Sequence, residues 1–404
     1  MKKKRILAVS IILLFFAVVW SIGWARNSCA SELKLVSTFE GGKLYKTDNK
    51  FDVLELEGTY RQMGRQYGKL LAKQLRKLYE IAINERLIKK ENISLKDIKQ
   101  LTKPTFNLYP RRIKEIVYGM SEASGMSVDE INALNQLASL IVIFKKDVYC
   151  SGIAAWADYT AGGPLVFGRN FDYPPYFKEF AKFLTIVVYK PQDGANYVAT
   201  IGYAGGIETL NAMNDAGLFV EINDGCRAGG KIFSEDRAPF IISPLTFLLD
   251  YSTLEQLGAA IDATRANYAL LLNIADKNAA YSYECTIFGV RRRKGINEGL
   301  LVATNHFVDS SWNIAKPPLS DPSLTLQRRE NLLALGEKYK GKINVKTMQK
   351  IMDTTIEKGG ATEPDDTIYQ IVAVPQQLKV WFKGRGYSDW VEIDLGPLFE
   401  KGTR

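Results

Sequence analysis

Short strand-like segments paired across turns begin near residue 150, and they constrain the fold more than any other feature. Apolar runs of strand length flank turn-rich segments such as residues 158–164 and 214–217, which is the pattern of a β-hairpin. The predicted hairpins join residues 153–157 to 165–167, 184–190 to 197–203, and 209–213 to 218–222. Helical patterns interrupt these hairpins. We therefore predict antiparallel sheets covered by helices, an α+β fold.

Residues 31–149 have a different pattern and are predicted to be mostly helical. A short strand is expected at residues 51–56, followed by helices at 60–78, 111–121 and 127–140, where apolar residues recur at helical spacing. Ser127 and Glu130 form a predicted capping box for the last of these helices. Gly64 and Gly68 share one face of the first helix, which predicts close packing there.

The rest of the chain alternates between the two kinds of pattern. Helices are expected at residues 243–249, 254–264, 324–338 and 345–356, with Ser252 and Glu255 as a capping box for the second. Strands are expected at residues 269–274, 280–290, 300–304, 368–374, 379–382 and 390–393.

Residues 1–30 form a predicted targeting segment. Basic residues at positions 2–5 precede an apolar run at positions 6–24, and small residues follow at Ser28 and Ala30. The run is long for a signal peptide and just long enough to span a bilayer. A cleaved signal peptide and a retained membrane anchor both stay open. Either one places the body of the protein outside the cytoplasm, secreted or anchored, because the positive charges stay inside.

Composition argues against several classes of partner. The formal charge of the 404 residues is +9, but residues 1–30 hold five of the 53 basic residues and no acidic one, so only +4 remains for the rest. The basic run at residues 291–294 is interpreted as a solvated turn, and we expect no nucleic-acid partner. With one histidine and no CxxC spacing, neither a zinc site nor any cofactor is expected. The sequence gives no oligomeric state.

Cys150 is the candidate nucleophile. A cysteine nucleophile needs a base, and His306 is the only histidine in the chain. The α-amino group of Cys150 itself would serve if the Tyr149–Cys150 bond were cut, because its pKa of about 7.7–8.0 suits proton transfer near neutral pH. We therefore interpret Cys150 as the future first residue of a processed chain.

Four segments carry a resemblance to a known family. They are CSGIAAW at residues 150–156, GRNFDY at 168–173, LEGTYRQMGRQYG at 56–68 and GMSVDEINALN at 125–135. Together they resemble the N-terminal-nucleophile (Ntn) cysteine amidases, and within these the isopenicillin N acyltransferase-like family, which is related to choloylglycine hydrolases and penicillin V acylases. The resemblance covers roughly residues 50–400. It implies a four-layer αββα sandwich, with a helical prosegment at residues 31–149 and a catalytic domain at residues 150–404.

The resemblance also implies an activity. It implies a precursor that cleaves itself before Cys150 and then hydrolyses linear non-peptide amides, or transfers their acyl groups, through a thioester on Cys150. The expected substrate is a small amide with an apolar acyl group.

Further site residues follow from position and resemblance together. Arg169 and Asp172 lie at the end of the strand next to Cys150, where a guanidinium would favour the thiolate and a carboxylate would orient the amine. Asn223 and Asn305 end two strands and are expected to bind the oxyanion. The resemblance adds a late arginine at Arg328, with Arg329 as a competing choice.

Several alternatives stay open at this point. Trp156, Phe171, Tyr176 and Tyr203 are candidates for an apolar acyl pocket, although core packing explains aromatic residues equally well. Cys226 and Cys285 could pair as a disulfide or be buried as thiols. The rival functions are an unprocessed hydrolase that uses a Cys150–His306 dyad and a tethered binding protein without activity.

Overall fold

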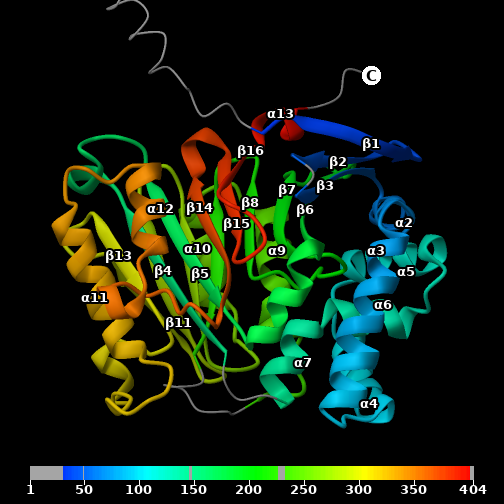
Figure 1. The fold of residues 1–404 in the computed structure, drawn as a ribbon, viewed down its shortest axis with the longest axis horizontal. Coiled ribbons are helices and arrows are strands. Elements are labelled where there is room, and N and C mark those ends of the chain that lie inside the picture. The colour runs from blue at the N-terminus through cyan, green and yellow to red at the C-terminus, as the bar shows by residue number, and fades with distance from the viewer. Residues whose placement is uncertain (1–30, 49, 145–147, 226–232, 401–404) are drawn as a thin grey trace, which may run out of the picture.

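The computed structural model describes residues 31–48, 50–144, 148–225 and 233–400, and it has the predicted α+β fold with two stacked sheets (Figure 1). In order, the larger sheet contains β1 (Leu33–Phe39), β2 (Gly42–Thr47), β3 (Phe51–Gly58), β6 (Leu184–Pro191), β7 (Val198–Tyr203), β8 (Asn211–Asn214), β9 (Phe219–Asp224), β10 (Leu270–Ala275), β11 (Ala280–Cys285) and β12 (Val290–Lys294). The smaller sheet contains β13 (Leu300–Ala303), β4 (Tyr149–Ala155), β5 (Val166–Asp172), β14 (Thr367–Val374), β15 (Lys379–Gly384) and β16 (Val391–Asp394). Between these strands, every pairing in the described ranges is antiparallel except the one between β3 and β6.

Helices lie outside the two sheets. The helices before residue 150 are α2 (Tyr60–Leu70), α3 (Ala72–Leu78), a π-helix at Tyr79–Lys90, α4 (Leu95–Asn107), α5 (Arg111–Ser124), α6 (Val128–Asn135) and α7 (Leu137–Phe144). Those after it are α9 (Ser243–Asp250), α10 (Leu254–Ala263), α11 (Thr325–Lys338), α12 (Val345–Asp353) and the short α13 (Gly396–Phe399).

Alternate side chains of the smaller sheet face different layers. Ile153 and Val166 are buried in one cluster with Met348 of α12 and Leu332 of α11. On the opposite face, Phe167 packs against Phe219 of the larger sheet, with ring centroids 5.1 Å apart. Helix α9 packs on β7 and β8 of the larger sheet. These layers form the αββα arrangement that the resemblance implies.

The contact between α2 and α5 is as close as the glycines predict. A Cβ atom added to Gly64 would lie 2.2 Å from the Ile116 carbonyl oxygen, and one on Gly68 would lie 2.4 Å from the Met120 oxygen. Gly119 on α5 makes the reciprocal approach, 2.2 Å from the Arg61 oxygen. Glycine is therefore needed on both helices at this crossing.

Residues 31–149 contain more strand than predicted. The hairpin of β1 and β2 is absent from the prediction, because five of the seven residues of β1 are exposed and the strand lacks a buried face. The helical pattern at residues 60–78 is divided between α2 and α3, which meet at Leu71. The capping box at Ser127 is confirmed. The one predicted at Ser252 is shifted by one residue, since the Thr253 side chain accepts from the Gln256 N–H.

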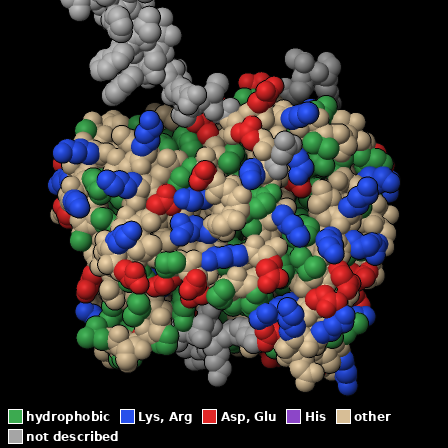
Figure 2. All heavy atoms as spheres, viewed as in Figure 1, with side chains coloured by type: hydrophobic (Ala, Val, Ile, Leu, Met, Phe, Trp, Pro, Cys, Tyr) green, Lys and Arg blue, Asp and Glu red, His purple; other side chains and the backbone are tan. Residues whose placement is uncertain are grey.

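The predicted domain boundary lies inside the fold. The Tyr149–Cys150 bond is within β4, and β3 hydrogen-bonds in parallel to β6, so residues 31–149 and 150–404 share the larger sheet. The predicted targeting segment, residues 1–30, lies outside the described residues. Across the ranges that are described, no helix is long and apolar enough to cross a membrane. Figure 2 shows basic and acidic side chains interspersed over the face in view.

Candidate active site

Cys150 is the second residue of β4, between β5 and β13 in the smaller sheet. Its side chain is 3% exposed and belongs to the apolar cluster between the sheets, together with Ala154 on the same face of the strand. Residues of two neighbouring strands and of both sheets can therefore reach it.

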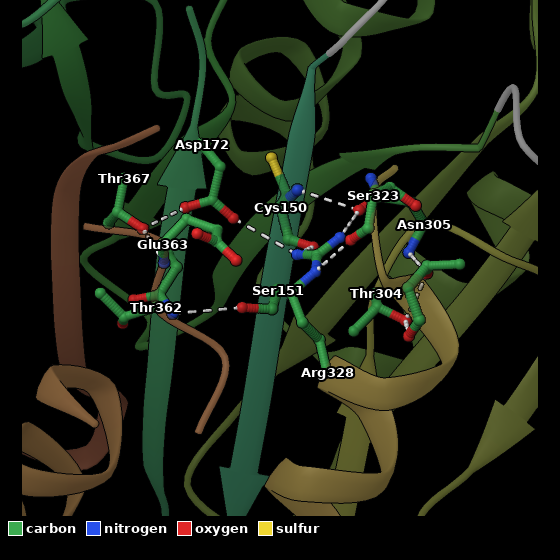
Figure 3. A network of polar contacts seen from close by, with 12 residues as sticks. Cys150, Ser151, Asp172, Thr304, Asn305, Ser323, Arg328, Thr362, Glu363 and Thr367 are labelled. Atoms are coloured by element: carbon green, nitrogen blue, oxygen red, sulfur yellow. Dashed lines mark hydrogen bonds and ion pairs between the residues drawn. The ribbon is translucent and has the colours of Figure 1, made fainter. Parts of the chain in front are cut away.

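Three side chains contact three different parts of Cys150. Arg169 Nη2 lies 3.4 Å from the Cys150 Sγ atom. The Cys150 backbone N–H donates to Asn305 Oδ1 at 3.0 Å. Arg328 Nη1 donates to the Cys150 carbonyl oxygen at 2.9 Å. Figure 3 shows Asn305 and Arg328 directed at the backbone of Cys150. The thiol, the nitrogen and the carbonyl of one residue are thus all held by side chains that the sequence predicts.

Arg328 links Asp172 to this arrangement. The fully buried guanidinium lies 3.3 Å from Asp172 Oδ2, donates to Asn305 Oδ1 at 2.7 Å, and binds the Ser323 carbonyl oxygen through Nε at 2.8 Å. Thr367 donates to the other Asp172 oxygen at 2.7 Å (Figure 3). Of the two competing arginines, Arg328 is the one that reaches Cys150.

Arg169 is held by a buried carboxylate that sequence reasoning missed. Its Nη1 atom pairs with Glu221 of β9 and donates to Asn223 Oδ1 at 2.9 Å, while Asn273 donates to the other Glu221 oxygen at 2.6 Å. Gly152 leaves room for this pair, because a Cβ atom there would lie 2.2 Å from Glu221 Oε1. A charged residue between the apolar residues Val220 and Ile222, two positions before Asn223, is the signal that could have found it.

Burial dominates the electrostatics of the site. It raises the pKa of the Cys150 thiol, and the positive charge of Arg169 opposes this rise. Burial also raises the pKa of the Asp172 carboxyl, against the opposing effect of Arg328. In the uncleaved chain, the Cys150 thiol therefore keeps its proton until a base removes it.

The two asparagines have different contacts from those of simple oxyanion donors. Asn305 presents its carbonyl oxygen to the Cys150 N–H, and its Nδ2 donates to the Asp224 backbone oxygen at 2.9 Å. Asn223 accepts from Arg169 and donates to the Ala303 oxygen at 3.4 Å. In this geometry Asn305 orients the nitrogen of Cys150, and Asn223 orients Arg169.

His306 has the environment of a neutral, buried ring. Its Nδ1 atom lies 2.9 Å from Thr325 Oγ1 and 3.3 Å from Thr304 Oγ1. Burial, reinforced by nearby arginines, lowers the pKa of His306 to about 4. Such a ring is a weak proton acceptor near neutral pH, which disfavours the alternative Cys150–His306 dyad.

The Tyr149–Cys150 bond is buried. Tyr149 pairs with Asp172 across β4 and β5, and the Arg328 guanidinium lies 5.6 Å from the centre of the Tyr149 ring. The same arginine therefore contacts the residues on both sides of the predicted processing bond.

A cavity of about 80 Å³ opens beside Cys150, and we call it the Cys150 cavity. Ile143 of α7 and Phe233 line it and are 47% and 42% exposed, so they mark its mouth. Its apolar lining also contains Ala138, Val142, Val148, Tyr173, Leu210, Ile222, Pro239, Ile241 and Tyr268. Its polar lining contains Thr105, Gln136, Ser139, Asp224 and Asn267. The lining is mainly apolar, and helix α7 of the predicted prosegment is part of it.

The aromatic residues predicted for the acyl pocket do not line the Cys150 cavity. Trp156 directly follows the last residue of β4 and is six residues from Cys150, which is roughly 20 Å for an extended chain. Phe171 and Tyr203 line a second, smaller cavity, and Tyr176 lines neither. The acyl-pocket prediction chose aromatic residues close to Cys150 in the sequence. The residues that line the cavity instead come from helix α7, the larger sheet and the loops beside them.

Two further expectations concern metals and disulfides. In residues 31–48, 50–144, 148–225 and 233–400, no group of three or more His, Cys, Asp or Glu side chains could hold a metal ion. Cys285 is buried, but Cys226 lies outside the described residues, so their pairing stays a prediction.

No protein-family model and no curated protein matches this sequence. Similar solved structures include a Caenorhabditis elegans orthologue of N-acylethanolamine-hydrolysing acid amidase, with 17% identity, a TM-score of 0.41, and coverage of 56% of this chain and 93% of that one. A variant of conjugated bile acid hydrolase from Clostridium perfringens has 14% identity, a TM-score of 0.45, and coverage of 62% and 94%. Penicillin V acylase from Agrobacterium tumefaciens has 12% identity, a TM-score of 0.38, and coverage of 63% and 89%. Similarities this distant say nothing about the reaction of this chain.

Proposed function

We propose that this protein is an Ntn cysteine amidase of the isopenicillin N acyltransferase-like kind, which cleaves itself before Cys150 and hydrolyses small linear amides or transfers their acyl groups. The observation that carries the proposal is the convergence of Arg169, Asn305 and Arg328 on the thiol, nitrogen and carbonyl of Cys150. A buried structural cysteine also needs partners for its backbone N–H and carbonyl oxygen, but it does not need a guanidinium beside its sulfur. A residue whose own nitrogen becomes a catalytic base needs all three groups held in place.

Self-cleavage would use the groups already in contact. The Cys150 thiol attacks the Tyr149 carbonyl carbon, a thioester forms between that carbon and Sγ, and the Cys150 nitrogen leaves as an amine that takes up the thiol proton. Water then hydrolyses the thioester, giving a carboxylate on Tyr149 and a free thiol. Arg169 stabilises negative charge on the sulfur, and Asn305 keeps the departing nitrogen oriented through the 3.0 Å hydrogen bond.

Turnover would repeat this chemistry on an external amide. The free amine of Cys150 accepts the thiol proton, the sulfur attacks the substrate carbonyl carbon, and the protonated amine gives a proton to the leaving nitrogen. Water or an acceptor amine then resolves the thioester. Burial raises the thiol pKa, so a base on the same residue is an effective way to generate the nucleophile.

The substrate class follows from the Cys150 cavity. Its apolar lining suits an apolar acyl group, and its mouth at Ile143 and Phe233 leaves room for a polar amine outside. As part of the same proposal, the protein acts outside the cytoplasm, with residues 1–30 as a signal peptide or membrane anchor. The proposed reaction requires no cofactor.

Trapping the acyl-enzyme tests the proposal. Purified protein is mixed with N-acyl aminocoumarin amides, quenched in acid and digested, and peptide mass spectrometry is used to find the thioester. The proposal predicts an acyl group on the peptide that begins with Cys150. His306→Ala should retain turnover, whereas loss of turnover in this variant with a normally folded protein would favour the dyad. Absence of hydrolysis and of any adduct would favour a binding protein.

A further inference from the structure

A second cavity lies next to the Cys150 cavity, and we call it the aromatic cavity. It has a volume of about 40 Å³. Its lining includes the aromatic side chains Phe171, Phe177, Tyr203 and Tyr369. Phe171 is the residue directly opposite Cys150 across β4 and β5, so the aromatic cavity begins one strand away from the nucleophile.

Among the residues that the structure describes, two line both cavities. They are Ala138 on α7 and Leu210 just before β8. Tyr173 lines the Cys150 cavity and stacks on Phe171, with ring centroids 4.1 Å apart, and Phe171 stacks on Tyr369 at 4.3 Å. This aromatic stack forms one rigid side of the partition between the two cavities. Ala138 and Leu210 form the other, aliphatic side.

We infer that Leu210 and Ala138 form a wall that sets the length of the acyl group, confining it to the Cys150 cavity and keeping it out of the aromatic cavity. The inference rests on the proposed function, because it concerns the acyl group that Cys150 would carry. It assigns this enzyme to short or compact acyl chains and identifies Leu210 as the residue that determines this specificity.

The backbone at Leu210 is fixed independently of its side chain. Its carbonyl oxygen accepts from the Ile222 N–H at 2.9 Å, and the next residue but one, Ala212, pairs with Val220 in the larger sheet. Truncating the Leu210 side chain should therefore remove part of the wall without moving the strand. The volume gained joins the two cavities beside Cys150.

The chain offers two matched controls. Ile241 lines the Cys150 cavity but not the aromatic cavity, so Ile241→Ala removes similar bulk without opening the wall. Gly202 lines the aromatic cavity, and a Cβ atom there would meet no other atom within 4 Å. Gly202→Val should therefore partly fill the aromatic cavity and reverse the effect of Leu210→Ala in the double variant.

The hydrolysis experiment uses aminocoumarin amides of straight-chain acyl groups from acetyl to myristoyl. In Leu210→Ala, the kcat/KM optimum should move to a longer chain than in the wild type, with a gain of about tenfold or more for the first chain that enters the aromatic cavity. Ile241→Ala should keep the wild-type optimum, and Gly202→Val in the Leu210→Ala background should restore it. An optimum that stays in place in Leu210→Ala, or moves equally in Ile241→Ala, overturns the inference.

A binding experiment separates this inference from the proposed reaction. Full-length Cys150→Ala protein, with and without Leu210→Ala, is titrated with free fatty acids of the same lengths, and the shift in Tm is recorded. The inference predicts stabilisation by longer fatty acids only when Leu210 is truncated. If the dependence of the Tm shift on fatty-acid length changes in Leu210→Ala while no amide is hydrolysed, the inference about the wall holds and the proposed function fails. If neither the binding nor the hydrolysis profile moves, the wall is disproved.

Discussion

Glu221 supplies the negative charge that balances Arg169 beside the Cys150 thiol. Both side chains are completely buried, and Asn273 donates a further hydrogen bond to the carboxylate. Removing one partner of a buried ion pair leaves an uncompensated charge, which costs about 3–5 kcal/mol. We expect Glu221→Gln to lower the free energy of unfolding by about this amount, measured by urea denaturation.

A matched control for this prediction is Glu392→Gln. Glu392 pairs with Lys379, whose side chain is 28% exposed and so remains partly hydrated. The control should therefore change the unfolding free energy by about 1 kcal/mol or less. Equal losses of unfolding free energy in the two variants would show that the buried Arg169–Glu221 pair contributes no more to stability than the partly exposed Lys379–Glu392 pair.

Glu208 is a second buried carboxyl, and it lines the aromatic cavity. Tyr109 and Ser139 donate to its two oxygens at 2.5 and 2.7 Å, and burial raises its pKa from 4.5 to about 7. Because the folded state holds this proton more tightly, the resulting stabilisation is complete below pH 4.5 and is lost as the pH rises through 7. The change amounts to about 3 kcal/mol.

The Glu208 prediction is tested by the slope of the unfolding free energy against pH. Urea unfolding across this pH range should show wild-type stability falling as the pH rises, and Glu208→Gln should flatten that fall. Asp250→Asn, which removes an exposed carboxylate paired with Arg112, should keep the wild-type slope. A slope unchanged by Glu208→Gln would mean that Glu208 titrates in the folded protein much as it does in the unfolded chain.

The sequence predicted the site residues that follow a local pattern. Arg169 and Asp172 follow Cys150 on the next strand, and Asn305 and Arg328 were identified through strand ends and resemblance. Glu221, Gly152 and the cavity-lining residues of α7 were missed. Their roles depend on how the sheets and helices stack, and spacing along one strand carries no information about which strand of another sheet lies opposite.

At the scale of elements, the crossing of α2 and α5 depends on glycine. Gly64→Ala would place a Cβ atom 2.2 Å from the Ile116 oxygen, a backbone atom that cannot rotate away. Helix propensity alone would make this substitution stabilising by about 1 kcal/mol. We expect the opposite sign, a loss of about 1–3 kcal/mol from overpacking, measured by urea denaturation.

The control for the crossing is Gly202→Ala in β7. A Cβ atom at this position meets no neighbour within 4 Å, so the unfolding free energy should stay near the wild-type value. If Gly64→Ala instead stabilises the protein, as helix propensity alone predicts, then helices α2 and α5 do not pack as closely at Gly64 as described.

Elements with a strong local pattern were predicted, and those without one were not. The hairpins after Cys150, the glycine-faced helix and the Ser127 capping box follow from short-range spacing and are confirmed. Strand β1 has five exposed residues out of seven, so it lacks the alternation that identifies a strand. The parallel pairing of β3 with β6 joins segments more than a hundred residues apart, and no local pattern encodes it.

At the scale of the whole molecule, noncovalent contacts join the segments before and after the proposed cleavage site. Strand β3 hydrogen-bonds to β6, α7 lines the Cys150 cavity, and Tyr109 binds Glu208. Cleavage at one bond of β4 leaves all of these contacts in place. We expect processed protein to run as two fragments on a denaturing gel and as one species in size-exclusion chromatography. Separation of the fragments under native conditions would contradict this expectation.

The central claim is that Cys150 supplies both the sulfur and the amine. Intact-mass analysis and N-terminal sequencing of the active protein test it directly, with Cys150→Ala purified in parallel. The account predicts an active wild-type chain that begins at Cys150, and a Cys150→Ala chain that stays joined to Tyr149 and is inactive. Full activity in wild-type protein whose Tyr149–Cys150 bond remains intact would contradict the account.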